Sequence, residues 1–231
     1  MSANHAAFNL IFRFVENYIS PIAGRISSQR HVMAIRDGFI SAMPFMIVGS
    51  FLLVFAYPPF SPDTTWGFAR AWLDLAKEFE GRILTPFDMT MGIMSIYICA
   101  AISYNLGKHY EKSNQLDPFM CAMLSIMAFL LIAAPKTNGT LPVDSLGGTG
   151  IFTAILVAIY CVEMMRFLKA HNIGIRLPDQ VPPMIKNSFD LLIPVLVVVL
   201  TLYPLSLFIQ HHFDMLIPQA IMAIFKPLVS A

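Results

Sequence analysis

The sequence predicts an all-α integral membrane protein with about five transmembrane helices and further amphipathic helices at the membrane interface. The chain is 57% hydrophobic and 13% charged, with a mean hydropathy of +0.67, whereas soluble domains carry about 25% charged residues. Five apolar runs of 17 to 19 residues contain no charged residue and alternate with charged connectors. Runs of this length are sufficient to cross a hydrocarbon core of about 30 Å. The net charge of +1 indicates no nucleic-acid partner.

The first residues predict an amphipathic helix over residues 8–22, at the interface or packed on the bundle. Arg13 and Glu16 interrupt the apolar residues, which argues against a cleavable signal peptide. The apolar positions recur at three- and four-residue steps: Phe8, Ile11, Phe12, Val15, Ile19 and Ile22. This spacing is typical of a helix with one apolar face.

The first predicted span is Phe39–Tyr57, which ends before Pro58 and contains Pro44 near its start, where a missing N–H is tolerated. The connector Phe60–Asp88 predicts a second surface helix. The apolar residues that share one of its faces are Phe68, Trp72, Leu75, Ala76 and Phe79. Aromatic residues favour the headgroup level of a bilayer, so we expect this helix to lie there.

The next three predicted spans are Met89–Leu106, Pro118–Pro135 and Leu146–Val162. The short polar loop 107–117 predicts that the first two of these are antiparallel neighbours. Before the last span stand Gly147, Gly148 and Gly150. Such a cluster either cradles phosphate or allows a tightly packed helix start; the second is favoured, because no Lys-Ser/Thr follows.

Asn138-Gly139-Thr140 has the pattern of a glycosylation acceptor, to which a single tripeptide lends little weight.

The fifth predicted span, Leu191–Ile209, follows a polar approach, Leu177–Asp190, that prolines break repeatedly. Pro204 lies deep enough in the span to kink the helix. His211 and His212 mark the far interface, as solvated side chains rather than metal ligands. The apolar segment Met215–Phe225 is too short to span and predicts an interfacial piece or an incomplete helix.

The distribution of Lys and Arg predicts the orientation. Ten of the fifteen lie before the first span, between the second and third, or between the fourth and fifth; the other five lie in the alternate connectors. Cytoplasmic loops carry the excess of positive charge. The N-terminus is therefore expected in the cytoplasm of a multi-pass protein.

No catalytic constellation is present in the sequence, and no catalytic, metal or cofactor residue is predicted. Cys99, Cys121 and Cys161 are expected to be small buried hydrophobes, because their spacing fits no metal site. Six acids at the edges of the spans are the remaining candidates for substrate contact: Asp37, Asp88, Asp117, Glu163, Asp179 and Asp190. Helix capping or solvated loop charge is the favoured interpretation of each, and capping of the fifth span explains Asp190.

Two stretches carry a resemblance to a known family. LPDQVPPMIKNSFDLLIP, residues 177–194, resembles the LPxxVPxxVxxSFxxLIP-like string of the lactose/cellobiose/diacetylchitobiose-type IIC permeases of the bacterial phosphoenolpyruvate-dependent sugar phosphotransferase system. The matching residues are Leu177, Pro178, Val181, Pro182, Ser188, Phe189, Leu192, Ile193 and Pro194. Residues 35–54 resemble the family's first membrane segment with its xxGFxxxMPxxxxGS pattern. With residues 86–106, the likeness covers nearly the whole chain.

The resemblance implies a homodimeric, ten-span permease of the bacterial inner membrane that takes up a disaccharide while partner IIA and IIB subunits relay phosphate. Residues 1–231 correspond to the N-terminal scaffold and dimerisation half, and the sugar-binding half is expected to be absent. Substrate-binding residues are therefore unknown, and a disaccharide would bind only if the C-terminal half were supplied. The chain is not expected to be an enzyme. An alternative function is a membrane interaction protein, or a non-functional remnant, that pairs with a full-length permease.

Overall fold

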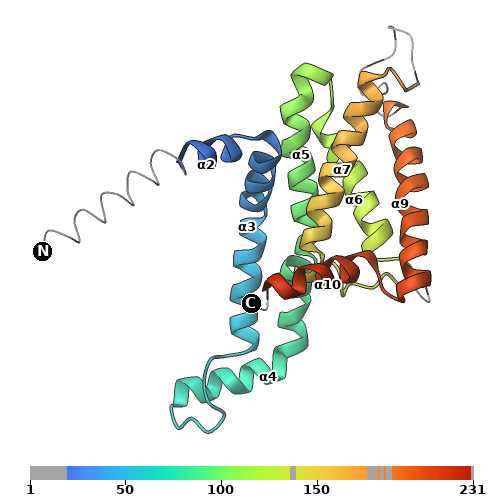
Figure 1. Ribbon diagram of the computed structural model, residues 1–231. Helices are drawn as coiled ribbons and strands as arrows, with labels where there is room; N and C mark the ends of the chain where they lie inside the picture. Colours follow the sequence, from blue (N-terminus) through green and yellow to red (C-terminus); the bar gives the residue numbers. More distant parts are fainter. Residues whose placement is uncertain are drawn as a thin grey trace, which may run out of the picture.

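The computed structural model describes residues 20–135, 139–175, 180, 182, 185 and 189–229. The secondary-structure elements in these ranges are all helices (Figure 1). The elements are α2 (Ser20–Ser27), α3 (Arg30–Ala56), α4 (Gly67–Phe87), η2 (Asp88–Gly92), α5 (Met94–Asn114), α6 (Pro118–Ala133), η3 (Gly148–Gly150), α7 (Ile151–Ala170), α9 (Leu192–Phe213) and α10 (Ile217–Val229). The all-α prediction is confirmed.

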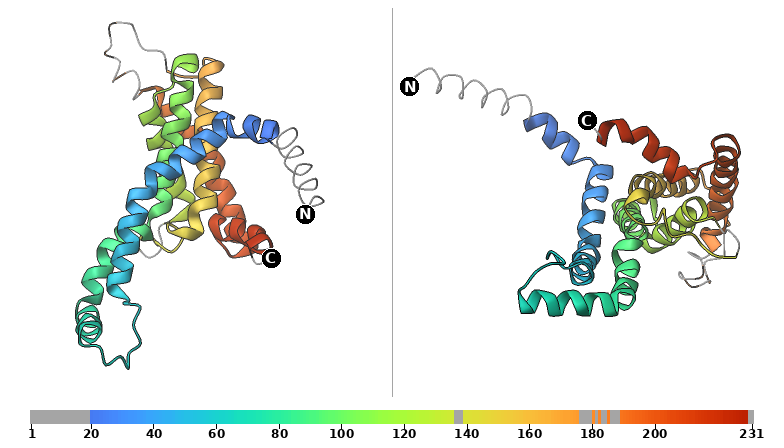
Figure 2. Two further views of the ribbon diagram at one scale, coloured as in Figure 1. Left: turned by 90° about the vertical axis from the view of Figure 1, so that its left-hand side faces the viewer. Right: turned by 90° about the horizontal axis from the view of Figure 1, so that it is seen from below.

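Among the described residues, five helices form an up-and-down bundle, and three others lie across its ends. In Figure 1, α3, α6 and α9 descend while α5 and α7 ascend. The central helix is α5, which packs against α3, α6 and α7. Seen from below, α3 and α9 stand on opposite sides of that centre (Figure 2). The crossing helices are α2 at the upper end and α4 and α10 toward the lower end.

Four helical stretches are long and apolar enough to cross a membrane: Arg30–Ala56, Gly67–Asn114, Gly148–Ala170 and Leu192–Phe213. The span predicted at Pro118–Pro135 is shorter in the structure, where α6 has 16 residues, about 24 Å. Because a residue before proline disfavours the α conformation, the helix ends at Ala133, and Ala134 takes φ −135° and ψ 57°. We therefore find four full-length candidate spans within the described residues, and α6 is a shorter apolar helix.

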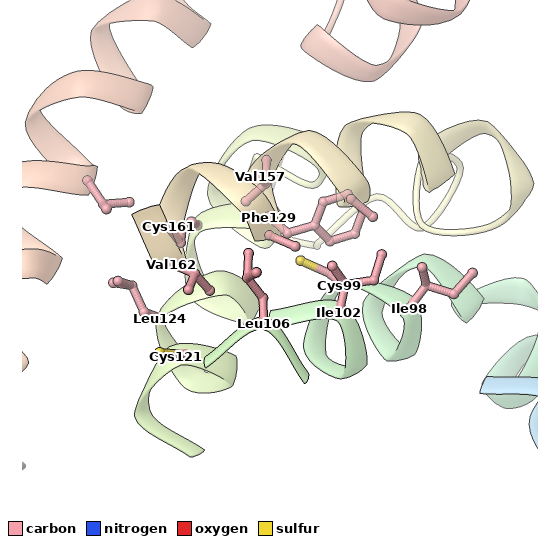
Figure 3. Packing of buried hydrophobic residues seen from close by; sticks show 14 of the residues in the cluster. Ile98, Cys99, Ile102, Leu106, Cys121, Leu124, Phe129, Val157, Cys161 and Val162 are labelled. Carbon is pink, nitrogen blue, oxygen red and sulfur yellow. The ribbon is translucent and has the colours of Figure 1, made fainter. Parts of the chain in front are cut away.

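The core lies between α5, α6 and α7, and it contains all three cysteines in the free, buried state, as predicted (Figure 3). Leu106, Phe129 and Val162 are fully buried beside them. Since these helices bury their apolar and small polar residues on one another, α5–α7 form the part of the bundle that is least exposed.

A π-helical turn, η2, connects α4 to α5, so the second span begins later than predicted. The helix α5 starts at Met94 rather than Met89 and continues to Asn114. Thr90 donates its hydroxyl hydrogen to Pro86 O at 2.8 Å, and the Tyr97 hydroxyl donates to Met89 O at 2.7 Å. These two bonds satisfy carbonyls that the irregular turn frees.

The surface helix predicted within residues 60–88 is present as α4, which packs on α3 and η2. Aromatic rings join its start to the end of α3 with centroid distances of 5.5 to 5.9 Å; the cluster consists of Phe55, Phe60, Trp66, Phe68 and Trp72. Trp72 Nε1 also donates to Phe55 O at 3.2 Å. Contact with lipid headgroups remains a prediction.

The last elements agree with the sequence. The helix α9 contains the predicted span and Pro204, and His211 and His212 are exposed in its last turn. The helix α10 has 13 residues, too few to span, and Phe225 stacks on Phe152 with centroids 4.5 Å apart. The predicted helix 8–22 lies outside the described residues except at its end, as do Asn138 and most of Leu177–Asp190.

Candidate functional site at the charged end of the bundle

The last two turns of α7 carry three charged residues at three-residue spacing, Glu163, Arg166 and Lys169. The predicted span ended at Val162, but the helix continues to Ala170. Because each step of three residues rotates only slightly around a helix, the three side chains occupy one broad face. This face meets the start of α3 and the far end of α5 at the upper end of the bundle in Figure 1.

The Glu163 carboxylate joins three helices. Its Oε1 accepts a hydrogen bond from the Tyr110 hydroxyl at 2.6 Å and lies 2.9 Å from His31 Nε2. Its Oε2 lies 2.8 Å from Arg166 Nη2. Only 26% of the side chain is exposed. Partners on both oxygens offset the cost of removing the charge from water. The sequence favoured a helix cap or a solvated loop charge for Glu163, and the structure shows neither.

Two guanidinium groups lie close to the Tyr110 ring. Arg30 Cζ lies 5.1 Å from its ring centroid and Arg166 Cζ lies 4.8 Å away. The tyrosine is 1% exposed. A cation near an aromatic face is attracted by the ring quadrupole, and the attraction strengthens where water is excluded. The cluster of Arg30, His31, Tyr110, Glu163 and Arg166, called the Glu163 cluster below, thus ties α3, α5 and α7 together.

Lys169 forms a second polar connection, from α7 to the start of α9. Its Nζ donates to Gln115 O at 2.7 Å and lies 3.3 Å from Asp190 Oδ2. A cavity of about 400 Å³ opens here. It is lined by Asn114, Gln115, Met165, Leu168, Lys169, Asn172, Ile173, Gly174, Ile175, Asp190 and Pro194. Amide groups above an apolar floor suit a small polar molecule, although the charged pair at the rim is already neutralised.

The charged side chains described at this end are engaged in contacts within the protein. In the described part of the chain, no three His, Cys, Asp or Glu side chains approach closely enough to hold a metal ion. Glu163, Arg166 and Lys169 already have protein partners. We interpret both polar connections as braces between helices. The cavity of about 400 Å³ lies beside the second brace, next to the start of α9.

The other edge acids have different positions. Asp117 caps α6, accepting from Phe119 N and Met120 N at 2.9 and 3.2 Å, which confirms its predicted role. Asp37 pairs with Arg36 at 2.8 Å on the surface, and Asp88 is exposed in η2. Asp179 lies outside the described residues.

Asp190 does not cap the fifth span, so this prediction is wrong. The N-cap residue of α9 is Leu191, with no side-chain cap, and the Asp190 carboxylate faces Lys169 instead. The pair is partly exposed, with 28% of the Lys169 side chain and 34% of the Asp190 side chain accessible. No sequence signal placed Lys169 opposite Asp190, because 21 residues of sequence separate them.

The glycine cluster before α7 packs closely against neighbouring backbone. This agrees with the tightly packed helix start that the sequence favoured over a phosphate cradle. A Cβ on Gly150 would collide with Ser145 O, and a Cβ on Gly147 would lie 3.1 Å from Gly92 O. Ser95 N also donates to Leu146 O at 2.9 Å. The loop before α7 therefore sits directly on the junction between η2 and α5.

Comparison with known proteins places this arrangement in a family. The family described as "Phosphotransferase system, EIIC" matches residues 36–229. The chain is 35% identical to the cellobiose-specific EIIC component of Geobacillus stearothermophilus, over 81% of this chain and 43% of that protein. It is 30% identical to the lichenan permease IIC component of Bacillus subtilis, over 87% and 46%, respectively.

A lactose-specific EIICB component of Streptococcus mutans is 32% identical over 91% of this chain and 36% of that protein. Among solved structures, the transporter ChbC, the IIC component of the N,N'-diacetylchitobiose-specific phosphotransferase system, superimposes with a TM-score of 0.77 at 31% identity. That match covers 94% of this chain and 52% of the ChbC chain. The chain spans less than half the length of these curated relatives and about half of the solved structure.

Proposed function

Because the chain belongs to the phosphotransferase system EIIC family, we propose that it acts as a membrane component in the uptake of a disaccharide of the cellobiose, chitobiose and lactose class. The observation that carries this proposal is the similarity to ChbC, at 31% identity over 94% of the chain. Fold alone would leave function open, so the proposal rests on the sequence identity that accompanies the shared fold.

We assign to residues 1–231 the scaffold and dimer-contact role within such a permease. The braces and the packed core of α5–α7 support this role, because they hold helices together rather than present free polar groups. Sugar-contacting residues then lie in the part of the relatives that this chain does not match. We assign phosphate transfer to partner IIA and IIB subunits; the name EIICB of the lactose-specific relatives supports a B unit next to the C unit. The chain itself would not be an enzyme.

The N-terminus is proposed to face the cytoplasm of a bacterial inner membrane. Arg30, Lys108, Lys112, Arg166 and Lys169 all belong to the upper end in Figure 1, where α3 begins and α5 and α7 end. Fewer cations belong to α4 and α10 at the lower end. The positive-inside rule then puts the Glu163 cluster and the 400 Å³ cavity on the cytoplasmic side.

The test is disaccharide binding by the 231-residue chain in detergent, measured by calorimetry with cellobiose, lactose and diacetylchitobiose. The full-length cellobiose-specific relative from Geobacillus stearothermophilus serves as the positive control. We expect the relative to bind cellobiose and this chain to bind none of the three sugars. Specific binding by this chain would contradict the scaffold assignment and place sugar contacts within residues 1–231.

A further inference from the structure

A groove lies between α3, α5 and α6, away from the charged end described above. It has a volume of about 370 Å³ and faces outward from the bundle. Its lining residues are Ser41, Phe45, Tyr97, Ala100, Ala101, Tyr104, Asn105 and Ala122. The three alanines form a low floor, and Phe45 and Tyr97, stacked with centroids 4.3 Å apart, form one wall. We call this feature the α3–α5 groove.

The groove runs along one stripe of α5 toward the charged end. Tyr97, Ala101, Tyr104 and Lys108 follow at steps of three and four residues, which places them on one helix face. The distance from Tyr97 to Lys108 along the helix is about 16 Å. This is roughly half of a hydrocarbon core. The groove itself is lined by α5 from Tyr97 to Asn105, and Lys108 follows it on the same face.

A cation lies beside the end of the groove at Tyr104, which we call its mouth. Lys108 Nζ lies 5.8 Å from the centroid of the Tyr104 ring, and the lysine is exposed. Among the described residues, no carboxylate lies within ion-pair distance of Lys108. The nearby Arg36 and Asp37 neutralise each other at 2.8 Å. Further along α5, Glu111 is followed by Lys112, so the lysines at this end of the helix outnumber its one acid.

Three of the polar side chains that line the groove, Ser41, Tyr97 and Asn105, donate hydrogen bonds within the protein. The Ser41 hydroxyl donates to Asp37 O, and the Tyr97 hydroxyl donates to Met89 O. Asn105 Nδ2 donates to Ala101 O. Since these donors are already used within the protein, a sugar would find few partners here, whereas an acyl chain needs none. The combination of an apolar trough and a cationic mouth fits an amphiphile.

We propose that the α3–α5 groove binds one anionic phospholipid, with its phosphodiester at Lys108 and Tyr104 and one acyl chain along Ala100 and Ala101. The proposed orientation of the chain puts this lipid in the cytoplasmic leaflet, where anionic lipids attract cations next to membrane helices. The site stands on the groove and its charge, and it does not depend on sugar transport.

The experiment is native mass spectrometry of the purified 231-residue chain, titrated with short-chain phosphatidylglycerol, phosphatidylcholine or glycerol 3-phosphate. We expect one phosphatidylglycerol to bind more tightly than phosphatidylcholine, and glycerol 3-phosphate not to bind. Lys108→Gln should weaken phosphatidylglycerol about fivefold, the effect of one cation near an anionic lipid surface. Lys112→Gln removes an equal charge one turn further along α5 and should change binding less than twofold.

A second variant tests the trough. Ala101→Phe fills the half-exposed floor and should abolish one-to-one binding of both lipids while the chain remains folded by circular dichroism. Equal losses for Lys108→Gln and Lys112→Gln would mean diffuse charge attraction and overturn the site. Binding of glycerol 3-phosphate alone would mean an anion site without a lipid trough. A dimer that Ala101→Phe dissociates, without lipid loss, would assign the groove to a second copy of the chain and also overturn the proposal.

Discussion

The two ends of α3 are held by different kinds of contact. Where α3 begins, the Glu163 carboxylate joins three helices. Where α3 ends, α3 meets α4 and η2 through aromatic rings and close backbone contact. Glu163 has partners on α3, α5 and within α7 at the first end. At the second end, Trp72 and Phe55 lie 5.6 Å apart, and Gly49 packs on Thr90 and Met91. Charged side chains form few contacts between elements at this second end. In one of these contacts, the Tyr57 hydroxyl donates a hydrogen bond to Glu80.

This difference shows two ways to hold helices where lipid provides no hydrophobic driving force between them. Hydrogen bonds between charged side chains fix which helices pair, but the stability that they provide depends on every member of the network being present. Small residues let backbones approach and gain from dispersion contacts spread over many atoms. We therefore expect a single substitution to have a larger effect at the Glu163 end than at the aromatic end.

The largest effect is expected for Glu163→Gln. The amide cannot neutralise Arg166, and with one oxygen in place of two it cannot serve Tyr110, His31 and Arg166 together, so a network that joins three helices is broken. Removing one partner of a buried pair costs about 3–5 kcal/mol; we expect about 2–3 kcal/mol here, because 26% of the side chain is exposed. The measurement is the free energy of unfolding in mild detergent. Glu111→Gln, on an exposed part of α5, is the control and should change stability little. Equal loss in both variants would contradict the brace.

Gly49→Ala tests close packing at the opposite end. A Cβ here would lie 2.8 Å from Met91 Cβ and 2.9 Å from Thr90 Oγ1, so α3 and η2 would have to separate. Overpacking costs about 1–3 kcal/mol and the gain in helix propensity offsets part, which leaves a loss of about 1–2 kcal/mol. The control is Gly81→Ala, where nothing lies within 4 Å. It should leave stability unchanged or raise it; a loss as large as at Gly49 would exclude packing as the cause.

A smaller loss of about 1 kcal/mol is expected for Trp72→Phe. The ring contacts are largely retained, but the hydrogen bond from Nε1 to Phe55 O is removed. Trp66→Phe, at a residue that is 60% exposed, should change the free energy of unfolding less. If Trp66→Phe proved more costly, the aromatic cluster would be stabilised by ring contact rather than by this hydrogen bond.

The smallest effect concerns pH. The hydrogen bond that Tyr57 donates to Glu80, at 2.8 Å, raises the pKa of this phenol above its ordinary value near 10. A raised pKa in the folded state means that the stabilising contribution is present below pH 10 and is lost as pH rises through the folded value. Thermal unfolding of the parent and Tyr57→Phe should differ slightly between pH 7 and 10, with the difference vanishing above. A difference that grows with pH would refute this assignment.

Much of the bundle could be predicted from the chain, because transmembrane helices satisfy their own backbone within a local segment. The positions of α3, α4, α9 and α10 follow from apolar runs, prolines and aromatic spacing. Predicted ends were less accurate where helices continued into polar residues, as α5 does to Asn114 and α7 does to Ala170. A charged residue ends an apolar run but not a helix, so hydropathy alone places such ends too early.

The candidate site shows the reverse. Glu163 and Asp190 were recognisable as acids at the edges of spans, but their partners were not. His31 and Tyr110 stand 132 and 53 residues away from Glu163 in sequence. Composition and periodicity determine that the chain is a helical membrane protein, because both are properties of local segments in contact with lipid. Only the packing of the bundle decides that Glu163 braces three helices and that Asp190 faces Lys169, because those contacts depend on how distant helices are rotated against one another.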